Sequence, residues 1–120
     1  MGKKHNILVI DDEENTRLLI AEELLEAGYK VDQAASAEEA RKKIESNSYD
    51  LVTLDIEMPG MNGVEFAGFL RKEIPGLRIV LLTAYSHYRH DLSSWAADAY
   101  VVKSPDLTEL KETIKKLLEM

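Results

Sequence analysis

The chain has 120 residues, of which 45% are hydrophobic and 31% are charged, and its formal net charge is −7. This length suits one domain with a genuine core, and the balance of apolar and charged residues argues against disorder. The negative charge argues against a domain that itself binds the phosphates of nucleic acids. Cysteine is absent, which excludes disulfides, thiolate zinc sites and thiol nucleophiles.

No apolar stretch approaches the roughly 20 residues of a membrane span, and the run after residue 6 is too short for a signal peptide. We therefore expect a cytoplasmic protein that does not contact a membrane. Internal repeats, low-complexity segments and linkers are also absent from the sequence. Residues 1–120 are accordingly predicted to form a single unit.

The first half of the chain alternates strand and helix patterns. Residues 7–10 are predicted to form a central strand that leads directly into four acids, residues 11–14. Residues 29–34 favour a second, more polar strand. The helix between them should end at Gly28 and bury four side chains: Leu18, Ala21, Leu24 and Leu25.

The alternation continues through the middle of the chain. Ser36 and Glu39 have the spacing of a capping box, which predicts a helix that ends near Asn47. The apolar run Leu51 to Leu54 is typical of a strand buried on both faces, and Asp55 stands at its end. A helix with one apolar face is predicted from Asn62-Gly63 to Pro75-Gly76.

The last third predicts two strands and two helices. Residues 78–83 form a strand pattern ending on Thr83, and residues from about 87 to 96 favour a largely polar helix. A fifth strand at residues 98–102 closes on Lys103. Ser104-Pro105 then predicts a helix start, with serine as N-cap and proline at N1. That helix should carry one apolar stripe: Leu107, Leu110, Ile114 and Leu117.

Five strands that alternate with five helices over short connections predict an α/β fold. Right-handed crossovers would place helices on both faces of one doubly wound, five-stranded parallel sheet. In a parallel sheet the strand ends of one polarity share an edge, and ligands bind there. The reactive groups that follow the strands should therefore converge at that edge: Asp11, Asp12, Asp55, Thr83 and Lys103.

This set of groups has the chemistry that phosphoryl transfer needs. Three carboxylates would repel one another unless a cation such as Mg²⁺ or an ammonium lay between them. A carboxylate can form an aspartyl phosphate, and the protein need then supply mainly positioning and positive charge. Asp55 is our candidate phosphoacceptor, with Mg²⁺ and Lys103 supplying charge and Thr83 a hydroxyl donor.

The chain resembles the receiver domain of two-component response regulators over essentially its full length. The residues that carry the resemblance are Asp11-Asp12, Asp55 within Leu54-Asp55-Ile56-Glu57-Met58-Pro59-Gly60-Met61-Asn62-Gly63, Thr83-Ala84, and Tyr100 three residues before Lys103. The resemblance implies a flavodoxin-like (βα)5 fold with strand order 2-1-3-4-5. It also implies that Asp55 takes a phosphoryl group from a sensor histidine kinase or a phosphotransfer protein.

The resemblance further assigns roles to residues around Asp55. Asp11, Asp12, Asp55 and the backbone carbonyl of Glu57 would surround Mg²⁺. Thr83 and Lys103 would bind the phosphoryl group. Tyr100 would rotate with Thr83 and change the face formed by residues 87–96, the fifth strand and the last helix. An output domain, a downstream protein or a second copy of the chain would recognise that face.

Two further residues are expected to tune the lifetime of the phosphoryl group. Glu57 and Tyr85 lie two residues beyond Asp55 and Thr83, and would flank the path of a hydrolytic water. One departure from the family is Ser104, which separates Lys103 from Pro105 where the family usually has Lys-Pro. The path of the Lys103 loop is therefore left open by the sequence.

Three other functions remain as alternatives. A Mg²⁺-dependent phosphohydrolase would also use an aspartyl phosphate, but Glu57 stands where such enzymes have a second aspartate. A flavin-binding protein would need a phosphate loop after residues 7–10, where this chain has four acids. A degenerate receiver that only docks would lack one of the required groups. We expect a signalling switch without turnover on a diffusible substrate.

Overall fold

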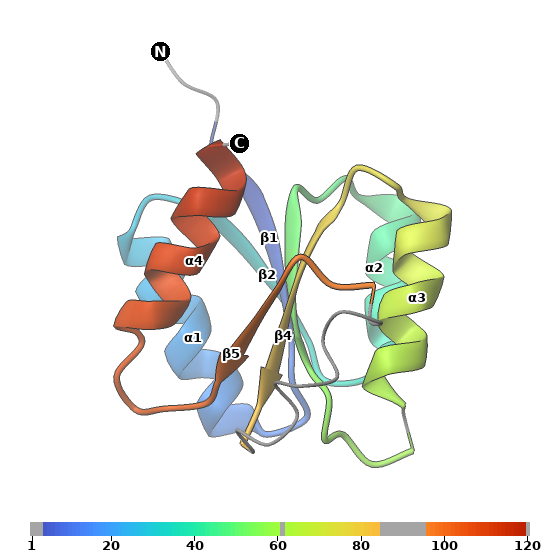
Figure 1. Cartoon of the computed structure of the whole chain (residues 1–120), viewed down its shortest axis with the longest axis horizontal. Coiled ribbons are helices and arrows are strands. Elements are labelled where there is room, and N and C mark those ends of the chain that lie inside the picture. Colours follow the sequence, from blue (N-terminus) through green and yellow to red (C-terminus); the bar gives the residue numbers. More distant parts are fainter. Residues whose placement is uncertain (1–3, 61, 85–95, 120) are drawn as a thin grey trace.

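The computed structural model describes residues 4–60, 62–84 and 96–119. Its five strands form one parallel sheet in the order β2-β1-β3-β4-β5 (Figure 1). The strands are β1 (Asn6–Ile10), β2 (Lys30–Ala34), β3 (Leu51–Asp55), β4 (Arg78–Thr83) and β5 (Ala99–Val102). The helices are α1 (Glu14–Glu26), α2 (Ala37–Ser46), α3 (Gly63–Glu73) and α4 (Thr108–Glu119). The predicted fold class and strand order are confirmed.

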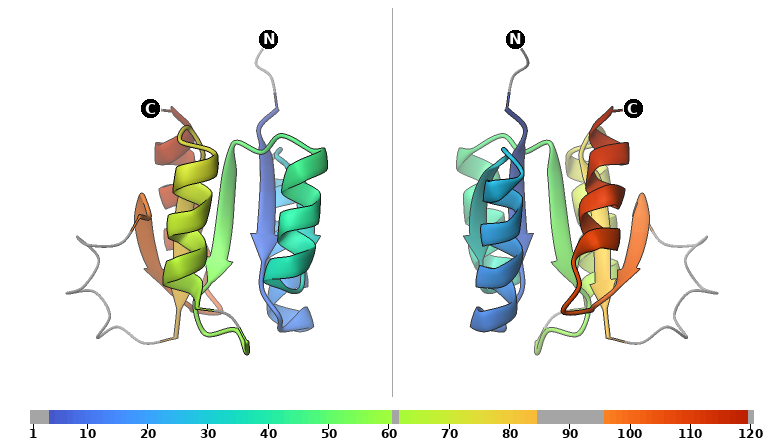
Figure 2. Two further views of the ribbon diagram at one scale, coloured as in Figure 1. Left: turned by 90° about the vertical axis from the view of Figure 1, so that its right-hand side faces the viewer. Right: turned by 90° about the vertical axis from the view of Figure 1, so that its left-hand side faces the viewer.

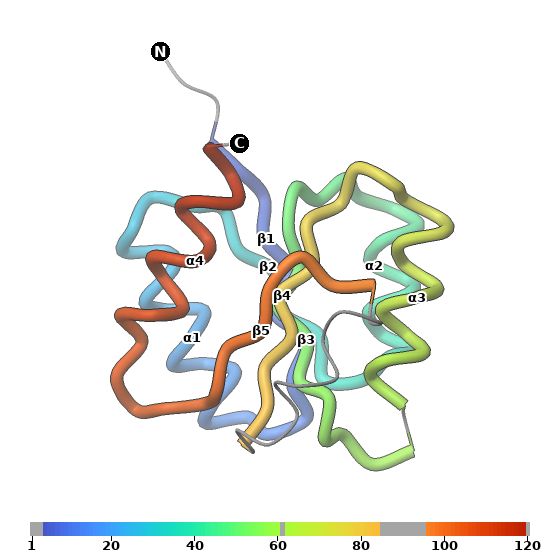
Figure 3. Tube along the Cα trace, viewed as in Figure 1, coloured from blue at the N-terminus to red at the C-terminus, as the bar shows by residue number. Residues whose placement is uncertain are grey.

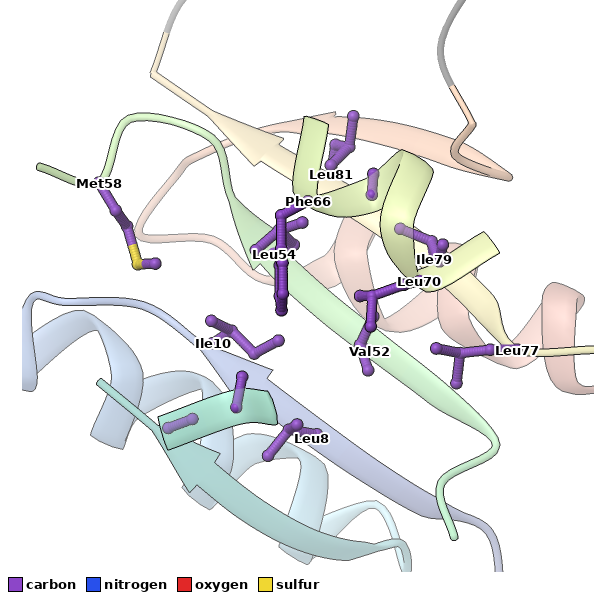
Figure 4. Close-up of a cluster of buried hydrophobic side chains, with 13 residues drawn as sticks. Leu8, Ile10, Val52, Leu54, Met58, Phe66, Leu70, Leu77, Ile79 and Leu81 are labelled. Carbon is purple, nitrogen blue, oxygen red and sulfur yellow. The ribbon is translucent and has the colours of Figure 1, made fainter. Parts of the chain in front are cut away.

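The helices cover both faces of the sheet. Helices α1 and α4 lie on one face and α2 and α3 on the other (Figures 1 and 2). Each face has its own apolar cluster, because successive side chains of a strand point to opposite sides. On the α2–α3 face, side chains of β1, β3 and β4 pack with side chains of α2 and α3 (Figure 4). The central strands are buried on both faces, as their apolar runs predicted.

Several predicted helix ends are confirmed by their capping geometry. Gly28 follows α1 with a φ of 99°, a left-handed conformation that favours glycine. The Ser36 hydroxyl accepts the Glu39 N–H at 3.1 Å at the start of α2. At the start of α3, the Asn62 side chain accepts the N–H groups of Val64 and Glu65. These caps satisfy backbone groups that a helix terminus otherwise leaves without partners.

The inward face of α1 differs from the prediction. Ala21 and Leu24 are buried as expected, but Ile20 joins them, whereas Leu18 and Leu25 are 39% and 53% exposed. Apolar side chains occupy most of the circumference of this helix. Its periodicity therefore does not decide which side faces the sheet, and packing against β1 and β2 does.

The start of the last helix also differs from the prediction. Helix α4 begins at Thr108 rather than directly after Ser104-Pro105. The Asp106 carboxylate accepts both the N–H and the hydroxyl of Thr108, so aspartate forms a turn before the helix. The predicted apolar stripe is confirmed, since Leu110 and Ile114 are buried and Leu107 and Leu117 pack beside them. The helix expected at residues 87–96 lies almost entirely outside the described residues.

Arg71 joins α3 to the start of β4 and the approach to β5. Its guanidinium donates to the backbone carbonyls of Pro75, Leu77 and Ala96, and to the Asp98 carboxylate at 2.5 Å. The same Asp98 oxygen accepts the N–H of Ile79 at 2.8 Å. One cation thus fixes the beginning of the edge strand to the rest of the fold.

Gly63 allows the loop after β3 to pass close to α3. A Cβ atom at this position would lie 2.6 Å from the Cα of Ile56, closer than side chains normally approach backbone. The approach of Ile56 to the start of α3 therefore requires a residue without a side chain at position 63. None of the helices in the described ranges has the length and apolarity to cross a bilayer.

We expect Gly63→Ala to destabilise the fold by about 1–3 kcal/mol, because the new methyl overlaps the backbone of Ile56. Gly68→Ala in the same helix is the matched control, since its added Cβ meets no atom within 4 Å beyond its chain neighbours and the backbone of its own helix. That control should stabilise by about 0.5–1 kcal/mol through helix propensity. Urea unfolding of both variants measures the difference, and equal effects would contradict the close approach.

Candidate phosphoacceptor site

The carboxyl ends of the strands bring the predicted groups to one edge of the sheet. Asp11 directly follows β1, Asp55 ends β3, Thr83 ends β4 and Lys103 directly follows β5. The carboxyl ends of these strands lie at the same edge of the sheet (Figure 3). The register continues to Lys103, whose N–H donates to the Thr83 carbonyl at 2.7 Å.

The Lys103 ammonium lies between two buried carboxylates. Its Nζ is 3.1 Å from Oδ2 of Asp11 and 3.0 Å from Oδ2 of Asp55. The Asp11 and Asp55 residues are 0% and 2% exposed, so water does little to stabilise their charges. Ser104 comes after this contact and does not prevent it.

The environment shifts the pKa values of two of these groups. Burial raises the pKa of Asp11 above its usual value, and the nearby charge of Asp55 adds to this. The hydrogen bond from the Glu13 N–H and the Lys103 ammonium act in the opposite direction. Burial by itself would lower the pKa of Lys103, but hydrogen bonds to Asp55 and Asp11 and their negative charges outweigh it and raise that pKa.

Three acids provide a plausible ligand set for a divalent cation. One carboxylate oxygen each from Asp11, Asp12 and Asp55 lies within 4.8 Å of the others. Asp12 is exposed, whereas the other two are buried. Oxygen-only donors of this kind suit Mg²⁺, which keeps several waters and takes few protein ligands. The donor set therefore fits the predicted cofactor.

Glu57 contacts the ends of both β3 and β4. Its backbone N–H donates to Oδ1 of Asp55 at 3.0 Å. Its carboxylate accepts the Thr83 hydroxyl on one oxygen and the Ala84 N–H, at 2.9 Å, on the other. The sequence predicted a Mg²⁺-binding carbonyl and a lifetime-tuning side chain for Glu57, but not this bridge to the end of β4. Residue spacing carried no signal for it.

A second residue that sequence reasoning missed is Arg17 of α1. Its guanidinium donates to the backbone carbonyl of Asp11 at 3.0 Å and to the Gln33 side chain at 3.1 Å. These bonds hold the turn that presents Asp11. Helical spacing alone gave Arg17 no distinction from other charged residues of α1.

Of the two tyrosines assigned to switching and lifetime, the structure describes Tyr100 but not Tyr85. Tyr100 is half-buried in β5 and pairs in register with Leu81, so it shares a sheet face with Thr83, two residues further along β4. Tyr85 lies outside the described residues, and its role stays a prediction.

The chain is similar to several known proteins over nearly all its length. The response regulator TrrA of Thermotoga maritima, solved in complex with Mg²⁺-BeF, is 62% identical, with a TM-score of 0.88 covering 94% of this chain and 98% of that one. TrrA in complex with the histidine kinase ThkA gives 61% identity and a TM-score of 0.86, covering 95% and 98%. The probable transcriptional regulator ycf27 of Cyanidium caldarium is 34% identical over 118 residues, which are 97% of this chain and 47% of that protein.

The chain thus spans about half the length of that regulator. The family model described as "Response regulator receiver domain" matches residues 7–115. This match covers all of the strands except the first residue of β1, the four acids after β1, and Asp55, Thr83 and Lys103. The chain belongs to the response regulator receiver domain family.

Proposed function

We propose that residues 1–120 form a receiver domain that acts as a switch, with Asp55 as the phosphoacceptor. The observation that carries the assignment is the Lys103 ammonium, 3.0 Å from an Asp55 carboxylate oxygen at the open edge of the sheet. A cation at this position stabilises the charge that develops during phosphoryl transfer. Asp55 also borders a cleft that Asp12, Glu57, Ala84 and Lys103 line, so a phosphoryl donor can approach it.

Asp11, Asp12, Asp55 and the backbone carbonyl of Glu57 would hold Mg²⁺ in this cleft. When bound, Mg²⁺ would neutralise charge on the acids and on the phosphoryl oxygens. The Mg²⁺-BeF complex of TrrA supports this proposal, because that protein shares 62% of its residues with this chain.

The phosphoryl donor in this proposal is a histidine kinase or a phosphotransfer protein. An Asp55 oxygen attacks the phosphorus of a phosphohistidine, the new P–O bond forms, and the P–N bond breaks to release the imidazole. The complex of TrrA with the kinase ThkA supports a partner of this class. Lys103 would hold the Asp55 carboxylate in position for the attack.

Phosphorylation would then change the surface around β5 and α4. The phosphoryl group carries about −1.5 to −2 charge and places three acceptor oxygens beside Thr83, while the carboxylate charge of Asp55 is lost when the P–O bond forms. The Thr83 hydroxyl would bind one of these oxygens, and Tyr100, on the same sheet face, would rotate as Thr83 moves. An output domain, a separate protein or a second copy of the chain would recognise the altered surface.

The switch would act in the cytoplasm and would not itself contact nucleic acid or membrane. Its net charge of −7 disfavours both phosphate backbones and anionic lipid. Signal termination would proceed by hydrolysis of the aspartyl phosphate, with Glu57 and Tyr85 controlling access of water. No turnover on a diffusible substrate is part of this function.

Treatment with acetyl phosphate and Mg²⁺ tests the assignment of Asp55. The wild-type chain should gain the mass of one phosphoryl group, whereas Asp55→Asn should gain none, because an amide is a poor nucleophile. Asp50→Asn, in the loop before β3, is the matched control and should be modified like wild type. Intact mass spectrometry reads the result, and modification of Asp55→Asn would contradict the proposal.

Replacing Lys103 by methionine should destabilise the fold in EDTA by about 2 kcal/mol, because two buried carboxylates lose their shared cation. Added Mg²⁺ should recover part of this loss by binding the same acids. Lys111→Met is the control, since Lys111 pairs with Glu23 where both side chains are more exposed, 40% and 32%, and should cost below about 1 kcal/mol. Urea unfolding measures both; equal costs would contradict the buried pair.

Thr83→Ala should leave phosphorylation of Asp55 possible but uncouple it from Tyr100. Beryllofluoride, a phosphoryl mimic, should shift the NMR resonances of the Tyr100 ring in the wild type and much less in the variant. Thr53→Ala provides a second buried threonine as control and should respond like wild type. A full Tyr100 response in Thr83→Ala would show that this hydroxyl does not transmit the signal.

A further inference from the structure

The side chain of Glu57 occupies donors that a phosphoryl group on Asp55 would need. One carboxylate oxygen accepts the Thr83 hydroxyl, and the other accepts the Ala84 N–H at 2.9 Å. The Glu57 backbone is held beside Asp55 by its own N–H, which donates to Oδ1 of Asp55 at 3.0 Å. The glutamate therefore spans the gap between the phosphoacceptor and the end of β4.

The donors around Asp55 divide into two groups. Lys103 contacts the Asp55 and Asp11 carboxylates. The Thr83 hydroxyl and Ala84 N–H contact Glu57. A carboxylate offers two oxygens of partial negative charge, and a phosphoryl group offers three. The carboxylate of Glu57 thus resembles part of a phosphoryl group in both charge and acceptor geometry.

Both anions cannot use these donors at once. Thr83 has one hydroxyl proton and Ala84 one amide proton, and two negative groups crowded at the end of β4 would repel each other. Thr83 is fully buried, so its hydroxyl has little access to water as a replacement partner. A phosphoryl group must therefore displace Glu57 before it can bind Thr83.

We propose that Glu57 is an internal competitor of the phosphoryl group and holds the unphosphorylated switch in place. This inference rests on the proposed role of Asp55. It adds that Glu57 lowers the free energy gained when the site binds a phosphoryl group. Occupancy by Glu57 lowers the affinity of the site for a phosphoryl group, because part of the binding free energy is used to break two existing hydrogen bonds. It also keeps Thr83 ordered when no phosphoryl group is present.

The competition is distinct from the effect of Glu57 on hydrolysis proposed above. Hydrolysis concerns the lifetime of a covalent bond, whereas competition alters the equilibrium binding of a mimic that forms no such bond. Beryllofluoride at saturating Mg²⁺ is therefore the suitable probe, and calorimetry gives its affinity directly.

Removing the competitor should tighten binding of beryllofluoride. We expect Glu57→Ala to bind it about tenfold more tightly than wild type, and Glu57→Gln to lie between the two, because a neutral amide oxygen accepts more weakly. Glu13→Gln is the control for general charge, since Glu13 lines the same cleft. If Glu13→Gln and Glu57→Gln gained equally in affinity for beryllofluoride, the loss of one negative charge would explain the effect, and the proposal would be overturned.

A double-mutant cycle separates competition from a structural role. In a Thr83→Ala background one of the contested donors is gone, so Glu57→Ala should gain less than in the wild type. An unchanged gain would show that Glu57 and Thr83 act independently. Hydrogen exchange at the Ala84 amide, without beryllofluoride, should be faster in Glu57→Ala; unchanged protection would show that the contact does not persist in solution.

The outcomes also distinguish a failure of this inference from a failure of the proposed function. If wild type binds beryllofluoride and Asp55 is modified by acetyl phosphate, but Glu57→Ala binds no more tightly, the competition is refuted and the switch stands. If Asp55 is not modified at all, the proposed function fails irrespective of Glu57.

Discussion

The ion pairs of Lys103 with Asp11 and Asp55 are the interaction on which the site depends. Two carboxylates that are almost fully buried would be costly to ionise without a cation between them. Lys103 supplies that cation from the neighbouring end of β5, within 3.1 Å of Asp11 and 3.0 Å of Asp55. The pair leaves one negative charge in excess, and exposed Asp12 adds another. The site is therefore prepared for a further cation.

The sheet makes this arrangement possible. Parallel pairing places the ends of β1, β3, β4 and β5 at one edge although their residues are far apart in the chain. The two apolar clusters fix the strands from both faces, so the polar groups at the edge are held by a rigid support. Loop residues such as Glu57 and Ala84 then complete the site. Gly63 permits the close approach of Ile56, the residue before Glu57, to the start of α3.

Much of the fold was predictable because hydrophobic periodicity and turn residues agreed with each other. The apolar run Leu51 to Leu54 predicted a strand buried on both faces, and Gly28 and Ser36 predicted helix ends that the structure confirms. The inward face of α1 was not predictable, because the apolar side chains of this helix point in most directions around its axis. The predicted start of α4 was wrong because Asp106, rather than Ser104, accepts the N–H of the first helical residue, Thr108.

The residues of the site likewise divide into those that the sequence predicted and those that it did not. Asp11, Asp55, Thr83 and Lys103 follow from their places at strand ends, which the fold class alone brings together. The Glu57 bridge and the Arg17 contact with Asp11 depend on side-chain conformations across loops. No sequence pattern encodes those conformations. The family match favours a receiver over a flavin-binding protein or a phosphohydrolase, and it rests on the same strand-end residues.

Arg71 has a consequence for how a signal can travel through β5. Its guanidinium and Asp98 anchor the approach to this edge strand to α3 and β4, while Lys103 stands at the opposite end. A strand held at its base cannot slide along its neighbour as a rigid rod. In the proposed switch, a change at the Lys103 end would therefore take the form of side-chain rotation, as at Tyr100, rather than a shift of β5 along its neighbour.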